Sequence, residues 1–273
     1  GPAPARGPEG ALGWRVGGNI KIAGKPETMA KYEGWLEVAR QFQLRTRAVT
    51  PKEIGEIVPG MRGDFVGGIF TENDGQAEPE KVTDAFAAAA RKGGAEISPG
   101  EAALEIVTEG GRVSGVRSER RFVRCDSAIV AAGAWSSRLL RPLGLDLPLL
   151  LVRASVTRIA PVRDITACGV WSPHVGFRQR SDGSVNLADG KTDHFLVPES
   201  IRHMRSFWSG LLANRGEVAL SVGLPFVEGL IDKLRGEPGD AYRKTRVLDP
   251  APNARRNANA VAAFRAAVPD IGE

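Results

Sequence analysis

The stretch that most constrains the fold is Ser-Ala-Ile-Val-Ala-Ala-Gly-Ala-Trp-Ser, residues 127–136. Ala128 to Ala131 form a short apolar run, which is typical of a strand buried on both faces of a sheet. Gly133 then stands between two alanines, so the main chain is nearly bare where this strand would turn into a helix. Many α/β proteins bind ligands at such a point, although a tight turn without a ligand shows the same pattern. Residues 132–135 are therefore expected to form either a ligand-binding turn or a tight turn without a ligand.

Composition narrows the class of protein. The chain has 273 residues, 42% of them hydrophobic and 25% charged, as in an ordinary globular protein with one or two domains. No apolar run approaches the roughly 20 residues of a membrane span, and no secretory signal is visible. The two cysteines and three histidines lack the spacing of a disulfide framework or a metal site. These features predict a cytoplasmic location and no transmembrane segment.

The basic charge is too small and too scattered to indicate a nucleic-acid surface. The formal net charge is +5, from 37 basic and 32 acidic residues. Arginines crowd residues 112–124, but Glu119 interrupts them and Phe122 is the one aromatic residue among them. A nucleic-acid interface normally combines a stronger basic face with interleaved aromatic residues. We therefore expect no nucleic-acid partner.

Local patterns predict helices and strands in mixed order up to residue 148. Thr50 and Glu53 have the spacing of a capping box before a helix. Proline in the first turn and apolar residues three or four apart predict helices at 26–42, 51–58 and 78–92. Strands are predicted at 15–23, 65–70 and 95–97, followed by a β-meander over 103–124 with a turn at Gly110-Gly111. This order predicts an α/β (α+β) fold.

From residue 149 onward the pattern favours an antiparallel sheet. A long strand is predicted from Leu149 to Ile159, followed by shorter strands at 167–171, 174–179 and 184–188. Helices are predicted at 198–212 and 253–268, and a further strand at 246–248. A second domain therefore begins near residue 149. Residues 1–14 are rich in Gly, Pro and Ala, which predicts a disordered linker.

Several of these segments resemble one family. Ala128–Ser136 is similar to the strand and turn of FAD-dependent oxidases and dehydrogenases of the D-amino acid oxidase type, which include glycine, sarcosine and opine oxidases. The same likeness extends from about residue 15 to the end, through segments 17–23, 75–79, 94–97, 109–116, 177–183 and 247–252. It implies an incomplete FAD-binding domain over 15–148, which includes the β-meander and part of the substrate domain near 26–70. It also implies a substrate domain over 149–252 and a helix over 253–273 that returns toward the FAD domain.

The resemblance also implies a chemistry and a set of site residues. The implied reaction is oxidation of the C–N bond of an amino acid, opine or secondary amine by hydride transfer to FAD. A partner subunit, as in the hetero-oligomeric opine oxidases, is implied as well. The cofactor would be contacted by Ala103, Ala132, Gly133, Ala134 and Trp135. The substrate would be contacted by Asn19, Trp171, His174 and Arg178, with Lys21 close to Asn19.

Each assignment has a plainer alternative. Ala132 to Trp135 could simply pack at a strand end, and Asn19 could lie on an ordinary exposed strand. Arg178 would suit a substrate carboxylate through a bidentate pair, but it could equally be a surface charge of a hairpin. His174 could act as a general base or be structural. A Ser-His-Asp hydrolase is disfavoured because Ser136 lacks the Gly-x-Ser-x-Gly context.

The chain departs from the family in one respect that bears on cofactor binding. The Gly-x-Gly-x-x-Gly turn that holds the FAD pyrophosphate is absent from the sequence. The family pattern would place this turn before residue 15, and it continues beyond the last helix into a segment that closes on the flavin. We therefore expect a truncated chain that is colourless and inactive alone. The alternative is a non-catalytic remnant or partner-binding subunit, and an NAD-dependent enzyme is disfavoured.

Overall fold

The computed structural model divides into two compact units. The first unit comprises residues 1–96, 154–190 and 252–273, and the second comprises residues 97–153 and 191–251. The structure describes residues 12–149, 151–213, 216–223, 226–227, 230–231, 234 and 246–271. Most of the predicted linker, residues 1–11, lies outside the described residues. This division groups segments by packing, and the functional domains inferred from the sequence stay a prediction.

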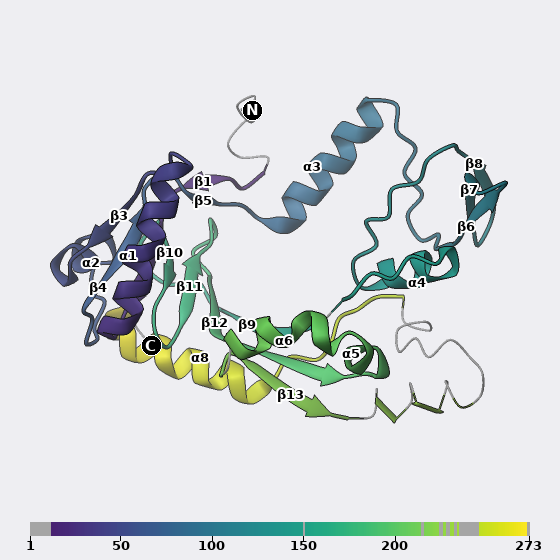
Figure 1. The fold of residues 1–273 in the computed structure, drawn as a ribbon. Coiled ribbons are helices and arrows are strands. Elements are labelled where there is room, and N and C mark those ends of the chain that lie inside the picture. Colours follow the sequence, from purple (N-terminus) through teal and green to yellow (C-terminus); the bar gives the residue numbers. More distant parts are fainter. Residues whose placement is uncertain are drawn as a thin grey trace. The chain divides into compact units, whose positions relative to one another are not determined.

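A mixed sheet forms the centre of the first unit (Figure 1). Its strand order is β11 (Gly176–Gln179), β10 (Gly169–Trp171), β2 (Asn19–Ala23), β4 (Gly67–Thr71) and β3 (Thr46–Val49). The first half of β12 (Val185–Leu196) pairs with β11, and β9 (Arg153–Ile159) pairs with β12. The predicted hairpin of β11 and β12 is antiparallel, as expected. However, β10 pairs with β2 in parallel, so residues far apart in sequence share one sheet.

One face of this sheet carries the core of the first unit. Strand alternation places Ile20, Val170 and Phe177 on the same face, and all three are buried. The helix α8 (Ala254–Ala267) covers this face with Phe264, which is fully buried. The rings of Phe177 and Phe264 meet edge to face with centroids 5.0 Å apart. The opposite face is therefore free to carry polar residues.

The helices of the first unit begin and end close to where the sequence patterns predict. They are α1 (Pro26–Gln41), α2 (Pro51–Ile57), α3 (Pro79–Lys92) and α8. The capping box of α2 is present, with the Glu53 main-chain N–H donating to the Thr50 hydroxyl and the Thr50 N–H donating to the Glu53 carboxylate. The predicted strand 15–23 is divided into β1 (Arg15–Val16), which pairs with β5 (Gly75–Gln76), and β2. The helix α3 buries none of its residues, and Phe86 on its apolar face is 74% exposed.

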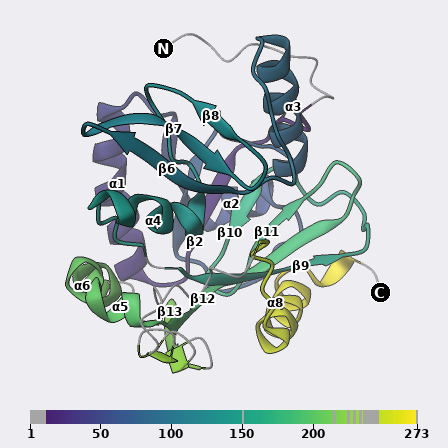
Figure 2. The same cartoon turned by 90° about the vertical axis from the view of Figure 1, so that its right-hand side faces the viewer.

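The second unit contains the predicted meander. Its strands are β6 (Ala103–Glu109), β7 (Arg112–Ser118) and β8 (Phe122–Arg124), paired in that order. Gly110 and Gly111 both have positive φ, 57° and 78°, as a tight hairpin turn of this hand requires. Beside β6 lies α4 (Ser136–Leu140), between the short helices η1 (Gly133–Trp135) and η2 (Arg141–Leu143) (Figure 2).

Among the described residues, the rest of the second unit contains two helices and the strand β13 (Val218–Val222). The predicted helix 198–212 consists of two helices, α5 (Pro198–Arg202) and α6 (Met204–Ala213), which are separated at His203. The strand β13 pairs in parallel with the second half of β12.

The predicted buried strand at Ala128–Ala131 is wrong. These residues form no strand, and Ile129 is 96% exposed. An apolar run becomes a buried strand only when neighbouring strands pair with its N–H and C=O groups. No described strand pairs with this segment. The short predicted strands at 95–97 and 246–248 are irregular as well. The turn after the apolar run is nevertheless present, as η1 leading into α4.

Candidate functional site

The polar face of the first unit's sheet is built around Asn19 and Lys21. These residues are two apart on β2, so their side chains lie on the same face, opposite to that of Ile20. Asn19 pairs with Thr71 of β4, and Thr71 pairs in turn with Thr46 of β3. The hydroxyls of Thr46 and Thr71 are hydrogen-bonded at 2.9 Å. The three strands therefore present a row of polar groups on this face.

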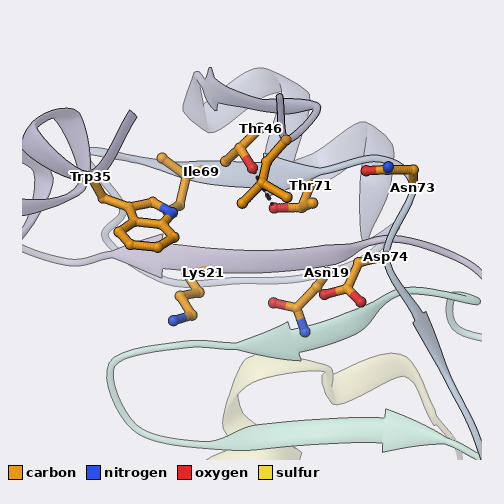
Figure 3. A pocket seen from close by; sticks show the side chains of 9 residues that line it. Asn19, Lys21, Trp35, Thr46, Ile69, Thr71, Asn73 and Asp74 are labelled. Carbon is orange, nitrogen blue, oxygen red and sulfur yellow. Dashed lines mark hydrogen bonds between the residues drawn. The ribbon is translucent and has the colours of Figure 1, made fainter. Parts of the chain in front are cut away.

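A pocket of about 360 Å³ lies over this row, and Trp35 of α1 is among the side chains that line it (Figure 3). Its volume is at the small end of the range for ligand pockets, which suits a small metabolite better than a dinucleotide. The pocket is lined by Asn19, Lys21, Trp35, Leu44, Thr46, Ile69, Thr71, Asn73 and Asp74.

Both signs of charge are present in the pocket. The Lys21 ammonium forms no ion pair or hydrogen bond with any described residue, and its side chain points to the same side as Asn19 (Figure 3). One carboxylate oxygen of Asp74 accepts a hydrogen bond from the Gly75 N–H at 2.8 Å. The Asp74 carbonyl accepts from the N–H groups of Gly17 and Gly18, at 3.3 and 2.9 Å, which fixes this loop against the start of β2.

Trp171 lies on the same face of the sheet. It pairs in register with Lys21 across the parallel β2–β10 ladder. Its ring fills the space next to Gly176, where a Cβ would collide with it, and a Cβ on Gly190 would lie 3.2 Å from the ring. Trp171 is 43% exposed. The sheet thus brings two predicted substrate residues, Asn19 and Trp171, onto one surface.

The other two predicted substrate residues are placed differently. His174 is exposed in the turn between β10 and β11. Arg178 is on β11, where its guanidinium donates to the Ala77 carbonyl at 2.9 Å and lies 3.4 Å from the carboxylate of Glu78. Arg180 approaches the same carboxylate at 2.8 Å, and Glu78 is only 5% exposed. Arg178 is therefore oriented toward the start of α3, and its pairing with a substrate carboxylate stays a prediction.

The residues expected to contact FAD are in the second unit. Ala103 begins β6, and Ala132, Gly133, Ala134 and Trp135 form the bend into α4. Gly133 has φ 52°, and no atom lies within 4 Å of the position that a Cβ would take. The N–H groups of Gly133 and Ala134 donate to none of the described residues. An open main chain with spare donors fits a nucleotide lying against it, and FAD contact at these positions stays a prediction.

Cys168 is close to the start of β10 but is unsuited to nucleophilic chemistry. It is 2% exposed, and burial raises the pKa of its thiol from an ordinary value of 9.0 to about 12. The thiol therefore stays protonated at neutral pH, whereas the thiolate is the reactive form. Among the residues that the structure describes, no group of three or more His, Cys, Asp or Glu side chains could hold a metal ion. No described helix is long and apolar enough to cross a membrane.

Fold and pocket together define a mixed α/β protein with a polar, ligand-sized site on one face of its sheet. Residues 5–258 match the family model described as "FAD dependent oxidoreductase" (DAO). Because this match covers most of the sequence, the chain belongs to the DAO family of FAD-dependent oxidoreductases, as the sequence resemblance predicts.

Individual relatives match over part of their length. The chain is 34% identical over 117 residues to a D-amino acid dehydrogenase of Paramagnetospirillum magneticum, which is 42% of this chain and 28% of that protein. It is 26% identical over 184 residues to sarcosine oxidase subunit beta of Rhodobacter capsulatus, 65% of this chain and 44% of that protein. The chain thus spans less than half the length of these relatives.

The fold itself is shared with solved structures of the family. The L-amino acid deaminase from Proteus vulgaris superposes with a TM-score of 0.83 at 20% sequence identity. That superposition covers 94% of this chain and 61% of the deaminase. At this level of identity the similarity establishes the fold, including the mixed sheet of the first unit.

Proposed function

We propose that this chain is part of an FAD-dependent oxidoreductase that oxidises the C–N bond of an amino acid, opine or secondary amine. Membership of the DAO family supports the cofactor and the redox class. The names of the relatives support the substrate class, since they refer to amino acids and sarcosine. A cytoplasmic location belongs to the same proposal.

The observation that carries the proposal is the polar face of the first unit's sheet. Asn19, Lys21 and Trp171 stand together on it, while the opposite face is closed by the core. Asn19 offers both a donor and an acceptor to a polar substrate, and Trp171 offers an aromatic wall that excludes water. When bound, FAD supplies the hydride acceptor for the substrate Cα–H. The protein's contribution is to bind and orient the substrate.

The family's cofactor would be held in part by the main chain around Gly133. The open bend there offers unpaired N–H groups for polar atoms of the nucleotide half. The sequence contains no Gly-x-Gly-x-x-Gly turn for the pyrophosphate. The test should therefore use the protein produced from its whole reading frame, including whatever coding sequence flanks this chain.

The decisive measurement is anaerobic reduction of the bound flavin. We expect the purified protein to show a flavin absorption spectrum that bleaches when a D-amino acid, an L-amino acid or an N-methyl amino acid is added. Trp171→Ala should slow this reduction by about tenfold or more through loss of substrate orientation, with Trp171→Phe intermediate. Trp208→Ala is the matched control, because Trp208 is a 56% exposed residue of α6. A flavin-loaded protein that none of these compounds reduces would overturn the proposal.

A partner subunit is a further part of the proposed function. The similarity to sarcosine oxidase subunit beta, a protein named as one subunit of several, supports it. Co-purification of a second polypeptide with the protein expressed at its native level is the expected result.

A further inference from the structure

We propose that β13 is the contact strand of a symmetric homodimer, in which two copies of this chain pair their β13 strands antiparallel and edge to edge. Leu220 lies on the two-fold axis of this dimer and faces Leu220 of the other copy. Val218 of each copy faces Val222 of the other. The inference goes beyond the proposed function, because it concerns a second copy of this chain and needs neither cofactor nor substrate.

The outer edge of β13 carries main-chain groups without partners. Among the described strands, β13 pairs with β12 alone. The Thr192 N–H donates to the Glu217 carbonyl at 2.7 Å, so alternate residues from Glu217 onward turn their main-chain groups toward β12. The N–H and C=O groups of Val218, Leu220 and Val222 therefore point away from β12, and none of them is bonded to a described residue. These groups can accept a further strand.

This edge lacks the features that usually keep an edge strand from pairing with another chain. Natural edges carry charged residues, proline or a bulge. The sequence of β13 is Val-Ala-Leu-Ser-Val, and its register with β12 is continuous. At the other end of the same sheet, β3 carries Arg47, which forms an ion pair with Glu53. The contrast between the two edges indicates that β13 is covered in the assembled protein.

The side chains of β13 are exposed beside a covered neighbour. Leu220 lies opposite His194 of β12, so both side chains are on the same face of the sheet. His194 is 1% exposed, and its Nε2 lies 3.0 Å from the Ser200 hydroxyl of α5. Leu220 is 49% exposed and Val222 is 69% exposed. A strand added at this edge would remove apolar surface of both residues from water.

The strand is complementary to a second copy of itself. Its outward-facing residues are spaced symmetrically about Leu220. Antiparallel pairing around a two-fold axis therefore gives reciprocal hydrogen bonds from Leu220 to its own copy and from Val218 to Val222. The side chains read almost the same in either direction, so apolar groups meet apolar groups. Glu217 would face Gly223, and no like charges are brought together by this register.

The test begins with sedimentation velocity of the protein produced from its whole reading frame. Two short strands bury less surface than a standard interface, so the dimer should dissociate on dilution. We expect a monomer–dimer equilibrium between about 1 and 100 µM protein.

Charge substitutions at the two-fold axis test the register. Leu220→Lys and Leu220→Glu each place two like charges opposite one another and remove an apolar contact. Each variant should therefore weaken self-association by about tenfold or more. An equimolar mixture of the two variants should form the dimer again, because the lysine of one copy then faces the glutamate of the other. The ladder with β12 is kept, since the Leu220 main-chain groups point away from it.

Val123→Lys is the matched control, because Val123 is 45% exposed on β8, which is also the last strand of a sheet. It should leave the equilibrium unchanged, and far-UV circular dichroism confirms that each variant is folded.

Four outcomes would overturn the inference. The first is a natural protein that stays monomeric over the whole range. The second is a Val123→Lys variant that dissociates as readily as Leu220→Lys. The third is a mixture of the Lys and Glu variants that remains monomeric. The fourth is a complex with a different polypeptide that Leu220→Lys dissociates, since the edge would then be covered by another partner. Flavin reduction is measured separately, so neither result decides the other.

Discussion

Cys168 shows how burial alone can decide the reactivity of a residue. Its pKa is raised to about 12 because its thiolate would be desolvated beside β10. We expect a thiol reagent at mildly alkaline pH to modify Cys125, which is partly exposed, and to leave Cys168 unmodified until the protein is unfolded. The measurement is mass spectrometry of the alkylated peptides before and after addition of urea.

The same pKa gives a direction for stability at high pH. The thiol keeps its proton in the folded state but ionises more readily in the unfolded state. The contribution of this thiol to the free energy of unfolding is therefore complete below its ordinary pKa of 9.0, and it decreases as the pH rises toward about 12. Cys168→Ser should lack this alkaline component, with Cys125→Ser as the control. Rapid alkylation of Cys168 in the native protein would contradict the buried position.

At the level of single residues, the sequence predicted some of the site and missed the rest. Asn19 and Trp171 do lie on one face. Trp35 falls within the predicted helix 26–42, where the spacing of apolar residues is that of an ordinary buried stripe. Asp74 stands in a turn next to Gly75, where such residues are common for conformational reasons. Both are brought to the pocket by the pairing of β2 with β4 and by the packing of α1, which local patterns do not encode.

Among the elements, α2 depends on its capping box, and its stability should depend on pH. The Thr50 main-chain N–H and hydroxyl, together with the Arg47 guanidinium, lower the pKa of Glu53 from 4.5 to about 2. Because the folded pKa is depressed, Glu53 contributes stability above pH 4.5 that is lost as the pH falls toward 2. Glu53→Gln should remove this part of the acid dependence of urea unfolding.

Glu56→Gln is the matched control for that measurement. Glu56 is on the same helix, its side chain is 64% exposed, and its nearest basic group, Lys52, is 4.0 Å away. We expect its pH profile to match that of the natural chain. Parallel profiles for Glu53→Gln and the natural chain would show that the capping carboxylate has no role in the acid dependence.

Elements defined by local chemistry were predicted well, and an element that depends on partners was not. Thr50 and Glu53 identify the start of α2, and Gly110-Gly111 identifies the β6–β7 turn, because each feature acts within a few residues. The apolar run at 128–131 indicates only that these residues prefer burial. Whether strands lie on either side of it is a property of other segments, and here Ile129 is 96% exposed.

In the whole molecule, the core of the first unit depends on a contact between distant parts of the chain. Phe264 of α8 is fully buried against Phe177 of β11. Phe264→Ala should reduce the free energy of unfolding by about 3–5 kcal/mol, since it removes a ring and leaves a cavity. Urea unfolding followed by far-UV circular dichroism measures this difference.

Two further variants make that measurement specific. Phe264→Leu should reduce the free energy of unfolding by less than Phe264→Ala does, because leucine keeps much of the volume of the side chain. Phe86→Ala should stay within about 0.5 kcal/mol of the natural chain, since Phe86 is 74% exposed on α3. An equal loss of stability for Phe86→Ala and Phe264→Ala would mean that the α8 contact does not secure the core.

The fold class could be predicted from the sequence, but the pairing of its strands could not. The order of helices and strands indicated a mixed α/β fold, which the structure has. The parallel pairing of β2 with β10 joins segments about 150 residues apart in the chain, Asn19 with Gly169. Periodicity gives the face of each strand but not its neighbour, so this pairing was beyond the sequence patterns.

The buried carboxylate of Glu78 limits the substitutions that this chain can accept. This carboxylate is shared by Arg178 and Arg180, whose side chains are themselves only 24% and 22% exposed. Removing the acid alone would strand two cations with little access to water. We therefore expect residues 78, 178 and 180 to change together in related sequences. This holds even though about a hundred residues of chain separate position 78 from the other two.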